Sequence, residues 1–237
     1  MNAGSGKFIR KTLVYACLVF LACTLFSFAA DFKWGRVKFE VKEKDTEDLW
    51  DKNMIYDTYF LEEVGRLTTL KVSTKVDVVP LNDLNIMTDY AILFMTASGT
   101  PVLTAKEKAN VKEYLLRGGF ILGDDCVDWR DEAITDKFYR GFKVLMEEIF
   151  PGKKMEDLPP EHPIYHAHFD LPKGLVCKGT NVGPGMGMHD DKGRLMVFSS
   201  CADLHCEWST KNLKKDDTRT TSAYKMGINI IMYALTH

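Results

Sequence analysis

The sequence lacks an internal repeat, a low-complexity tract and a long linker. With 237 residues, of which 46% are apolar, the chain is long enough to bury a single sizeable core. We therefore predict one domain over residues 34–237. The only glycine-rich stretch, NVGPGMGMHDD at residues 181–191, matches neither a Walker motif nor a dinucleotide fingerprint. The sequence therefore predicts no cofactor.

The first thirty residues contain no acidic side chain. Lys7, Arg10 and Lys11 precede an apolar run that ends in the small residues of Ser-Phe-Ala-Ala at 27–30. This order is typical of a secretory signal peptide, and the run is somewhat short for a membrane span of about 20 residues. We predict a signal peptide over residues 1–30, with an uncleaved anchor as the alternative. The protein is then exported, periplasmic or secreted, and meets the membrane only through this segment if it is retained.

An excess of positive charge is also missing. Removing the three basic residues of the signal from a total of 31 Lys and Arg leaves 28, against 33 Asp and Glu, a net charge of −5. Nucleic-acid-binding proteins usually present a basic surface, so this balance argues against a nucleic-acid partner. The remaining partner classes are an envelope protein and a small ligand.

Cysteines are few, and two of the six, Cys17 and Cys23, lie in the predicted signal. An even number remains, in a compartment that permits disulfides, so one or two bridges are predicted with their pairing left open. The remaining cysteines are Cys126, Cys177, Cys201 and Cys206.

Strand and helix patterns alternate along the domain. Residues 36–43 alternate polar and apolar side chains, which predicts a strand with one face in water. Apolar runs at 90–95 and 120–123 predict strands buried on both faces, and 76–81 and 194–200 predict two more. Helices are predicted over 46–70 with Thr46 as N-cap, 104–117 with a Thr104–Glu107 capping box, 136–149 and 221–235. The alternation predicts a doubly wound α/β sheet with helices on both faces, in which ligands bind at the carboxyl ends of the strands.

Several segments resemble one known family. They are GRVKFEV (35–41), YLLRGGFILGDD (114–125), FPGKKMEDLPPEHPIYHAHFDL (150–171), CADLHCEW (201–208) and AYKMGINIIMYALTH (223–237). Together they resemble the domain of unknown function 4159 family, which comprises secreted or membrane-linked bacterial proteins. The resemblance implies a flavodoxin-like sheet of the class I glutamine amidotransferase-like type, and it implies no reaction. The amidotransferase nucleophile elbow, Gly-x-Cys-x-Gly, is replaced here by Gly123-Asp124-Asp125-Cys126-Val127.

Cys126 is a candidate nucleophile, with His205 as the candidate base. A reactive thiolate needs a neighbouring histidine or a helix N-terminus, whereas the two carboxylates before Cys126 disfavour it. The structural alternative is a packed or disulfide-bonded cysteine. Asp124 and Asp125 are candidates for a ligand site in the sheet crevice, or for helix caps and a partner of Arg130.

The segment EHPIYHAHFD at residues 161–170 places His162, His166, His168 and Asp170 within nine residues. In an extended chain His166, His168 and Asp170 share one face, and these groups suit zinc or a similar ion. The alternative is a structural turn at His162-Pro163, with Asp170 paired locally.

From these patterns we predict a non-catalytic module that binds a ligand or partner at the carboxyl edge of the sheet. The predicted ligand-binding residues are Asp124, Asp125, His162, His166 and His205. The alternative is a hydrolase or amidase that uses Cys126 with a histidine, or a metal site of His166, His168 and Asp170.

Overall fold

One mixed sheet organises the chain. In the computed structural model the described residues are 31–43, 49–125, 137–175, 185–200, 202–209 and 218–237. Their main sheet has seven strands in the order β3-β1-β4-β6-β9-β8-β7. The bounds are β1 Phe32–Lys38, β3 Val72–Pro80, β4 Ile92–Ala97, β6 Phe120–Asp125, β7 Glu156–Asp157, β8 Met186–His189 and β9 Leu195–Ser200. A second, two-stranded sheet pairs β2 (Glu40–Val41) with β5 (Pro101–Val102).

The strands β3, β1, β4, β6 and β9 are all parallel, whereas β8 and β7 extend the sheet in antiparallel fashion. Counted along the chain, the parallel part has the order 2-1-3-4-5, which is the flavodoxin-like order of doubly wound sheets. The predicted α/β fold is therefore confirmed. The order reverses between β1 and β4, because the chain first moves from β1 to β3 and then returns past β1 to β4.

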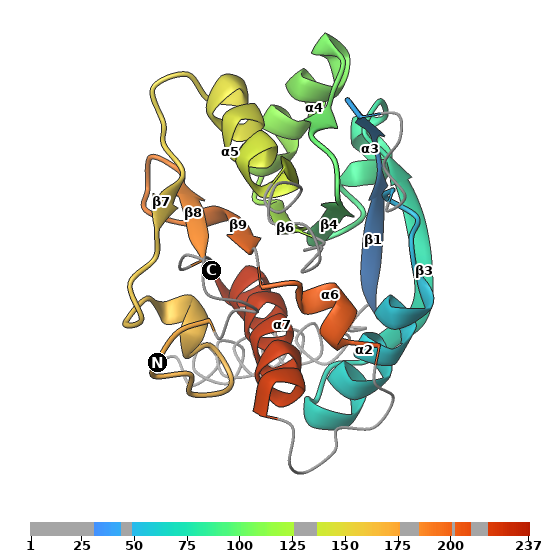
Figure 1. Cartoon of the computed structure of the whole chain (residues 1–237), viewed down its shortest axis with the longest axis vertical. Coiled ribbons are helices and arrows are strands. Elements are labelled where there is room, and N and C mark those ends of the chain that lie inside the picture. The colour runs from blue at the N-terminus through green and yellow to red at the C-terminus, as the bar shows by residue number, and fades with distance from the viewer. Residues whose placement is uncertain (1–30, 44–48, 126–136, 176–184, 201, 210–217) are drawn as a thin grey trace, which may run out of the picture. The chain divides into compact units, whose positions relative to one another are not determined.

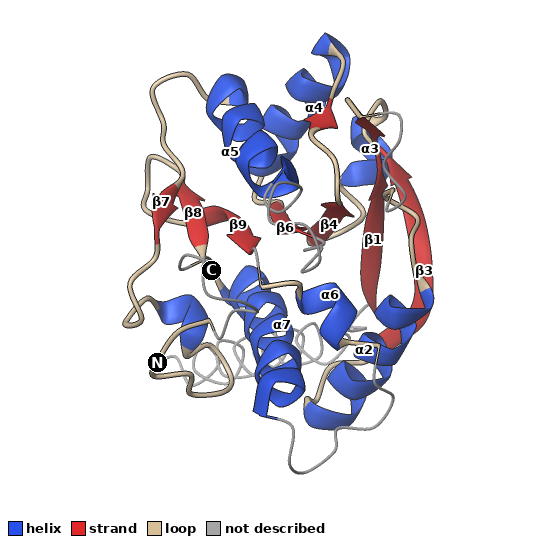
Figure 2. Ribbon diagram, in the orientation of Figure 1, coloured by secondary structure: helices blue, strands red, loops and turns tan. Residues whose placement is uncertain are grey.

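Helices cover both faces of the sheet, as Figures 1 and 2 show. The face that carries α2 (Ile55–Leu67), α6 (Leu204–Glu207) and α7 (Thr218–Thr236) encloses one apolar core, which contains Trp34, Phe60 and Trp208. The face that carries α3 (Leu84–Met87), α4 (Ala105–Leu116) and α5 (Lys137–Ile149) encloses a second core. We call these the α7 face and the α5 face.

The two faces follow from strand alternation, since successive side chains of a strand point to opposite sides. On β1, Trp34 belongs to the core of the α7 face and Val37 to the core of the α5 face. On β4, Phe94 and Met95 divide in the same way. The two cores are therefore separated by the sheet itself.

Local signals in the sequence account for the ends of α4. The Thr104 hydroxyl accepts the Glu107 N–H at 3.3 Å, and the Glu107 carboxylate accepts the Thr104 N–H at 2.8 Å. This confirms the predicted capping box. Gly118, with φ of +105°, ends the helix in a conformation that other residues rarely adopt.

The first predicted strand needs a correction. The structure begins it at Phe32. Of the polar residues that the alternation places on the wet face, Lys38 and Glu40 are exposed, whereas Arg36 is completely buried. The first helix, α2, begins at Ile55, and its predicted N-cap Thr46 lies outside the described residues. None of the helices in the described part of the chain is long and apolar enough to cross a membrane.

Candidate functional site

Asp124 and Asp125 are the last two residues of β6, and their side chains point to opposite faces of the sheet. Asp124 is fully buried on the α7 face, where its carboxylate accepts the backbone N–H groups of Leu204 and His205 at 3.2 and 2.9 Å. Asp125 points to the α5 face and accepts the N–H of Tyr139 at 3.1 Å. Each carboxylate therefore contacts the first turn of a helix, α6 or α5, and the pair does not share one crevice.

The environment of Asp124 favours its protonated form. Burial raises the pKa of this carboxyl well above its ordinary value, and the nearby Asp203 raises it further. The two α6 N–H groups and the Ser200 hydroxyl act in the opposite direction. A proton held here would have to leave before the carboxyl could bind a cation.

A buried polar group on the α7 face, the Arg36 cluster, consists of Trp34, Arg36, Asp57 and His205. Arg36 Nη1 lies 2.8 Å from Asp57 Oδ2, and the Trp34 indole N–H donates to Asp57 Oδ1 at 2.6 Å. His205 Nε2 lies 3.1 Å from Asp57 Oδ2 and 3.2 Å from Arg36 Nη1. The cluster thus joins β1, α2 and α6.

Charge in the Arg36 cluster is internally balanced. Burial raises the pKa of Asp57, but Arg36 and His205 outweigh it, so this pKa lies below its ordinary value. Burial lowers the pKa of His205, more than the neighbouring Asp57 raises it. At neutral pH the cluster therefore holds a guanidinium, a carboxylate and a neutral imidazole.

The Arg36 cluster borders the point where the strand order reverses, between the carboxyl ends of β1 and β4. A cavity of about 10 Å³ lies there, and Arg36, Thr96, His205 and Lys52 contribute to its lining. That volume admits about one water molecule. Open sheets of this type bind their ligands at such a point, yet here it is closed.

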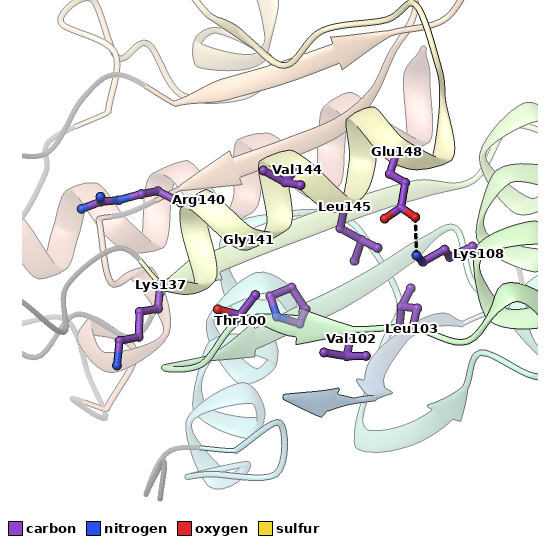
Figure 3. Close-up of a pocket in the computed structure, with 11 residues that line it drawn as sticks. Thr100, Val102, Leu103, Lys108, Lys137, Arg140, Gly141, Val144, Leu145 and Glu148 are labelled. Atoms are coloured by element: carbon purple, nitrogen blue, oxygen red, sulfur yellow. Dashed lines mark hydrogen bonds and ion pairs between the residues drawn. The ribbon is translucent and has the colours of Figure 1, made fainter. Parts of the chain in front are cut away.

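A much larger cavity opens on the α5 face, between β5 and α5 (Figure 3). We call it the β5–α5 groove; its volume is about 530 Å³, within the range of small-molecule sites. Leu103 and Leu145 are buried in it, whereas Val102 and Val144 are 47% and 65% exposed. The lining residues are Thr100, Pro101, Val102, Leu103, Lys108, Lys137, Arg140, Gly141, Val144, Leu145 and Glu148.

Positive side chains flank the β5–α5 groove. Lys137 and Arg140 extend from the beginning of α5, at one end of the groove in Figure 3. At the other end Lys108 pairs with Glu148 at 2.7 Å. Gly141 lets α5 approach the chain after β4, because a Cβ there would lie 2.7 Å from Cγ2 of Thr100. The groove thus combines apolar walls with cations at one end.

His162 and Asp124 lie near opposite ends of strand β9. The Nε2 of His162 is 3.3 Å from Nε2 of His189, which pairs with Leu195 at the start of β9. Asp124 pairs with Ser200 at the end of the same strand. The structure therefore does not bring His162 together with Asp124, although both were predicted for one site.

His166 and Asp170 pair directly, with Nδ1 and Oδ1 2.6 Å apart, as the structural alternative of a locally paired Asp170 predicts. The other ring nitrogen of His166 lies 2.9 Å from the Pro160 carbonyl oxygen, and His168 Nε2 lies 3.1 Å from the Leu67 carbonyl oxygen. The hydrogen bonds to Pro160 and Asp170 raise the pKa of His166. Within the described ranges, no three His, Cys, Asp or Glu side chains are grouped to hold a metal ion.

Three of the four cysteines of the predicted domain, Cys126, Cys177 and Cys201, lie outside the described residues. The remaining one, Cys206, is a half-buried thiol in α6 and contributes to the lining of the 10 Å³ cavity. The Cys126 nucleophile and the disulfide pairings therefore stay predictions.

Sequence reasoning named His205 and Asp124 as candidates but did not name Trp34, Arg36 and Asp57. One signal was available for Arg36, since it shares a strand face with Trp34, a side chain that is rarely left in water. A second signal was the acid Asp57 within the apolar pattern of the following helix. Together they indicate a buried ion pair.

Residues 36–235 match the family model of a domain of unknown function (DUF4159). The match covers most of the chain, which therefore belongs to this family. Comparison with curated protein sequences gives no significant match.

Proposed function

We propose that this member of the DUF4159 family is a non-catalytic binding module, and that the β5–α5 groove is its ligand-binding surface. The observation that carries the proposal is the volume of about 530 Å³ beside the strand carboxyl ends. The strand-end carboxylate on the same face, Asp125, already accepts the Tyr139 N–H. The polar side chains on the other face hydrogen-bond to one another around Arg36.

The groove chemistry supports an apolar ligand that carries an acidic group. Val102 and Val144 offer exposed apolar surface, which a ligand would remove from water. Lys137 and Arg140 place positive charge at the end where α5 begins. An envelope protein segment or a small molecule of this chemistry fits the proposal equally, and both would bury the two valines.

A fluorescent apolar anion, 8-anilinonaphthalene-1-sulfonate, tests the groove in the purified full chain. We expect saturable binding by fluorescence titration, and we expect Val144→Asp to raise the Kd about tenfold, because it adds negative charge and removes apolar contact. Val78→Asp on the outer strand β3 is the matched control, since Val78 is 45% exposed and lies away from the groove lining.

Two results would overturn the groove as the binding surface. One is the absence of saturable binding to the wild-type chain. The other is an equal loss of affinity in Val144→Asp and Val78→Asp. Near-UV circular dichroism of each variant must match the wild type, because this dye also binds partly unfolded chains.

We further propose that the module works outside the cytoplasm and descends from class I glutamine amidotransferase-like domains. Support for export comes from the basic, apolar and small-residue order of residues 1–30. Support for the descent comes from the flavodoxin-like strand order. Mass spectrometry of the protein from its native envelope fraction should find a chain without residues 1–30; an intact N-terminus in a cytoplasmic fraction would contradict export.

A further inference from the structure

Arg36 divides its guanidinium between two sets of partners. Nη1 faces Asp57 and His205 inside the Arg36 cluster. Nε and Nη2 face the other way and donate to two backbone carbonyl oxygens, of Trp50 at 2.7 Å and of Lys52 at 3.2 Å. Those carbonyls belong to residues 49–53, a segment before α2 that we call the strap.

Adjacent Nε and Nη2 donors form the fork that binds the two oxygens of a carboxylate. In this structure the strap carbonyls occupy the positions of those oxygens. A carbonyl oxygen carries only a partial charge, and hydrogen bonds to an ionised acceptor are roughly twice as strong as neutral ones. A carboxylate is therefore the stronger partner for this fork.

An independent observation comes from Thr96, at the carboxyl end of β4. Its side chain is 3% exposed and lines the same 10 Å³ cavity. Its Oγ1 is one of the buried side-chain oxygens that have no hydrogen-bond partner among the described residues. A buried hydroxyl without a partner destabilises the fold, so a ligand oxygen at this position would be favoured.

The backbone around the cavity also indicates that the strap can be displaced. Asn53 and Asp203 are the two non-glycine residues of the described chain with positive φ, at 52° and 56°. Asn53 lines the cavity, and Asp203 precedes the cavity-lining His205 of α6. Strained backbone of this kind is concentrated at ligand sites and switch segments. Four of the five strap residues, all except Trp50, are exposed, so little buried surface holds the strap in place.

We propose that the crevice between the carboxyl ends of β1 and β4 is a binding site for a small carboxylate. Nε and Nη2 of Arg36 and Oγ1 of Thr96 hold the ligand, and the strap lifts to admit it. The strap carbonyls occupy the site when no ligand is bound. This site lies on the α7 face, so it does not depend on the β5–α5 groove.

Acetate is the probe, and the Arg36 Nε–H resonance in a ¹H–¹⁵N spectrum of the full chain is the readout. We expect a saturable shift with sodium acetate at constant ionic strength, balanced with sodium chloride, and no shift with chloride alone. Inorganic phosphate, which is larger and tetrahedral, should bind more weakly.

Thr96→Val separates a ligand contact from a structural role. It removes the unpartnered hydroxyl but keeps the shape, so the fold should be retained while the acetate Kd rises about fivefold. Ser199→Ala is the matched control, because Ser199 Oγ is likewise buried without a partner among the described residues and does not line the cavity. Its acetate affinity should equal that of the wild type.

Asn53→Ala tests the strap. Alanine tolerates positive φ less well than asparagine, so the closed strap is disfavoured and acetate should bind several-fold more tightly. The proposal is overturned if acetate produces no saturable shift, if phosphate binds as tightly as acetate, or if Thr96→Val and Ser199→Ala weaken binding equally. Weaker binding in Asn53→Ala would overturn the role of the strap.

Discussion

The two faces of the sheet differ in how much open space they leave at the carboxyl ends of the strands. On the α7 face, Arg36, Asp57 and His205 bind one another and leave a cavity of about 10 Å³. On the α5 face, the β5–α5 groove leaves about 530 Å³ open between β5 and α5. The difference teaches that polar residues at strand ends do not by themselves mark the open site. Here they hold helices in place, and the open surface is mainly apolar.

The largest expected difference between the faces follows from removing Asp57. Asp57→Ala leaves the buried Arg36 guanidinium without its carboxylate, which should lower the free energy of unfolding by about 3–5 kcal/mol. Val144→Ser in the groove should change it by less than about 0.5 kcal/mol. Urea denaturation of both variants provides the measurement.

The double variant Arg36→Met/Asp57→Ala is the control for the ion pair. It removes both charges, so it should be more stable than Asp57→Ala alone. If Asp57→Ala costs no more than Val144→Ser, the Arg36 cluster does not hold the α7 face together.

Replacing each of two helical glycines by alanine should change the free energy of unfolding in opposite directions. A Cβ at Gly141 of α5 would lie 2.7 Å from Thr100 Cγ2, so Gly141→Ala should destabilise by about 1–3 kcal/mol. At Gly65 of α2 the nearest atom is 3.9 Å away, and Gly65→Ala should stabilise by about 0.5–1 kcal/mol. Thermal unfolding measures both. Equal effects would mean that the tight contact at the groove is absent.

Lowering the pH should decrease the free energy of unfolding, because His205 on the α7 face becomes protonated more readily in the unfolded chain. The folded-state pKa of His205 lies below the unfolded value of about 6.5, so its contribution is complete above that pH and is lost as the pH falls. The free energy of unfolding should decrease by up to about 1.4 kcal/mol per pH unit below about pH 6.5. Asp57, whose pKa is also lowered, adds a loss of the same sign, beginning below about pH 4.

His205→Asn should therefore flatten the dependence of urea unfolding on pH between about 6.5 and 5. His162 is the comparison, because burial and the nearby His189 and His237 lower its pKa to about 4 and give the same sign. His162→Asn should also flatten the profile, because a folded-state pKa of about 4 keeps this imidazole neutral between about pH 6.5 and 5, where the unfolded chain takes up its proton. A His205→Asn profile that equals the wild type would contradict the assignment.

The smallest effect is expected at the ion pair across one end of the groove. Lys108 and Glu148 are 28% and 58% exposed, so their coupling in a double-mutant cycle should be below about 1 kcal/mol and should fall with added salt. A coupling as large as the effect of Asp57→Ala would remove the contrast between the two faces.

Local patterns were sufficient to predict most of the fold. The apolar runs before Thr96 and before Asp124 predicted the two central strands, and the Thr104–Glu107 box predicted the start of α4. Shorter elements were missed: β7 and α6 have two and four residues and carry no measurable periodicity. Without β7 and β8, the sequence could not show that the sheet continues past β9.

The candidate site was harder to predict because its contacts join distant parts of the chain. Arg36 pairs with a carboxylate 21 residues later and with an imidazole 169 residues later, and no local pattern encodes those distances. Strand alternation, in contrast, already requires Asp124 and Asp125 to point to opposite faces. Grouping them in one crevice overlooked that rule.

The alternation at the end of β6 has a consequence for how the domain tolerates change. Asp124, which accepts an N–H of α6, and Asp125, which accepts an N–H of α5, are consecutive residues. Deleting or inserting one residue in β6 would therefore turn each carboxylate to the opposite face of the sheet, and both helices would lose their partner at once. Substitutions at either position, however, affect a single helical layer. The layers can therefore diverge independently through point mutation, whereas the length of β6 is held fixed by both.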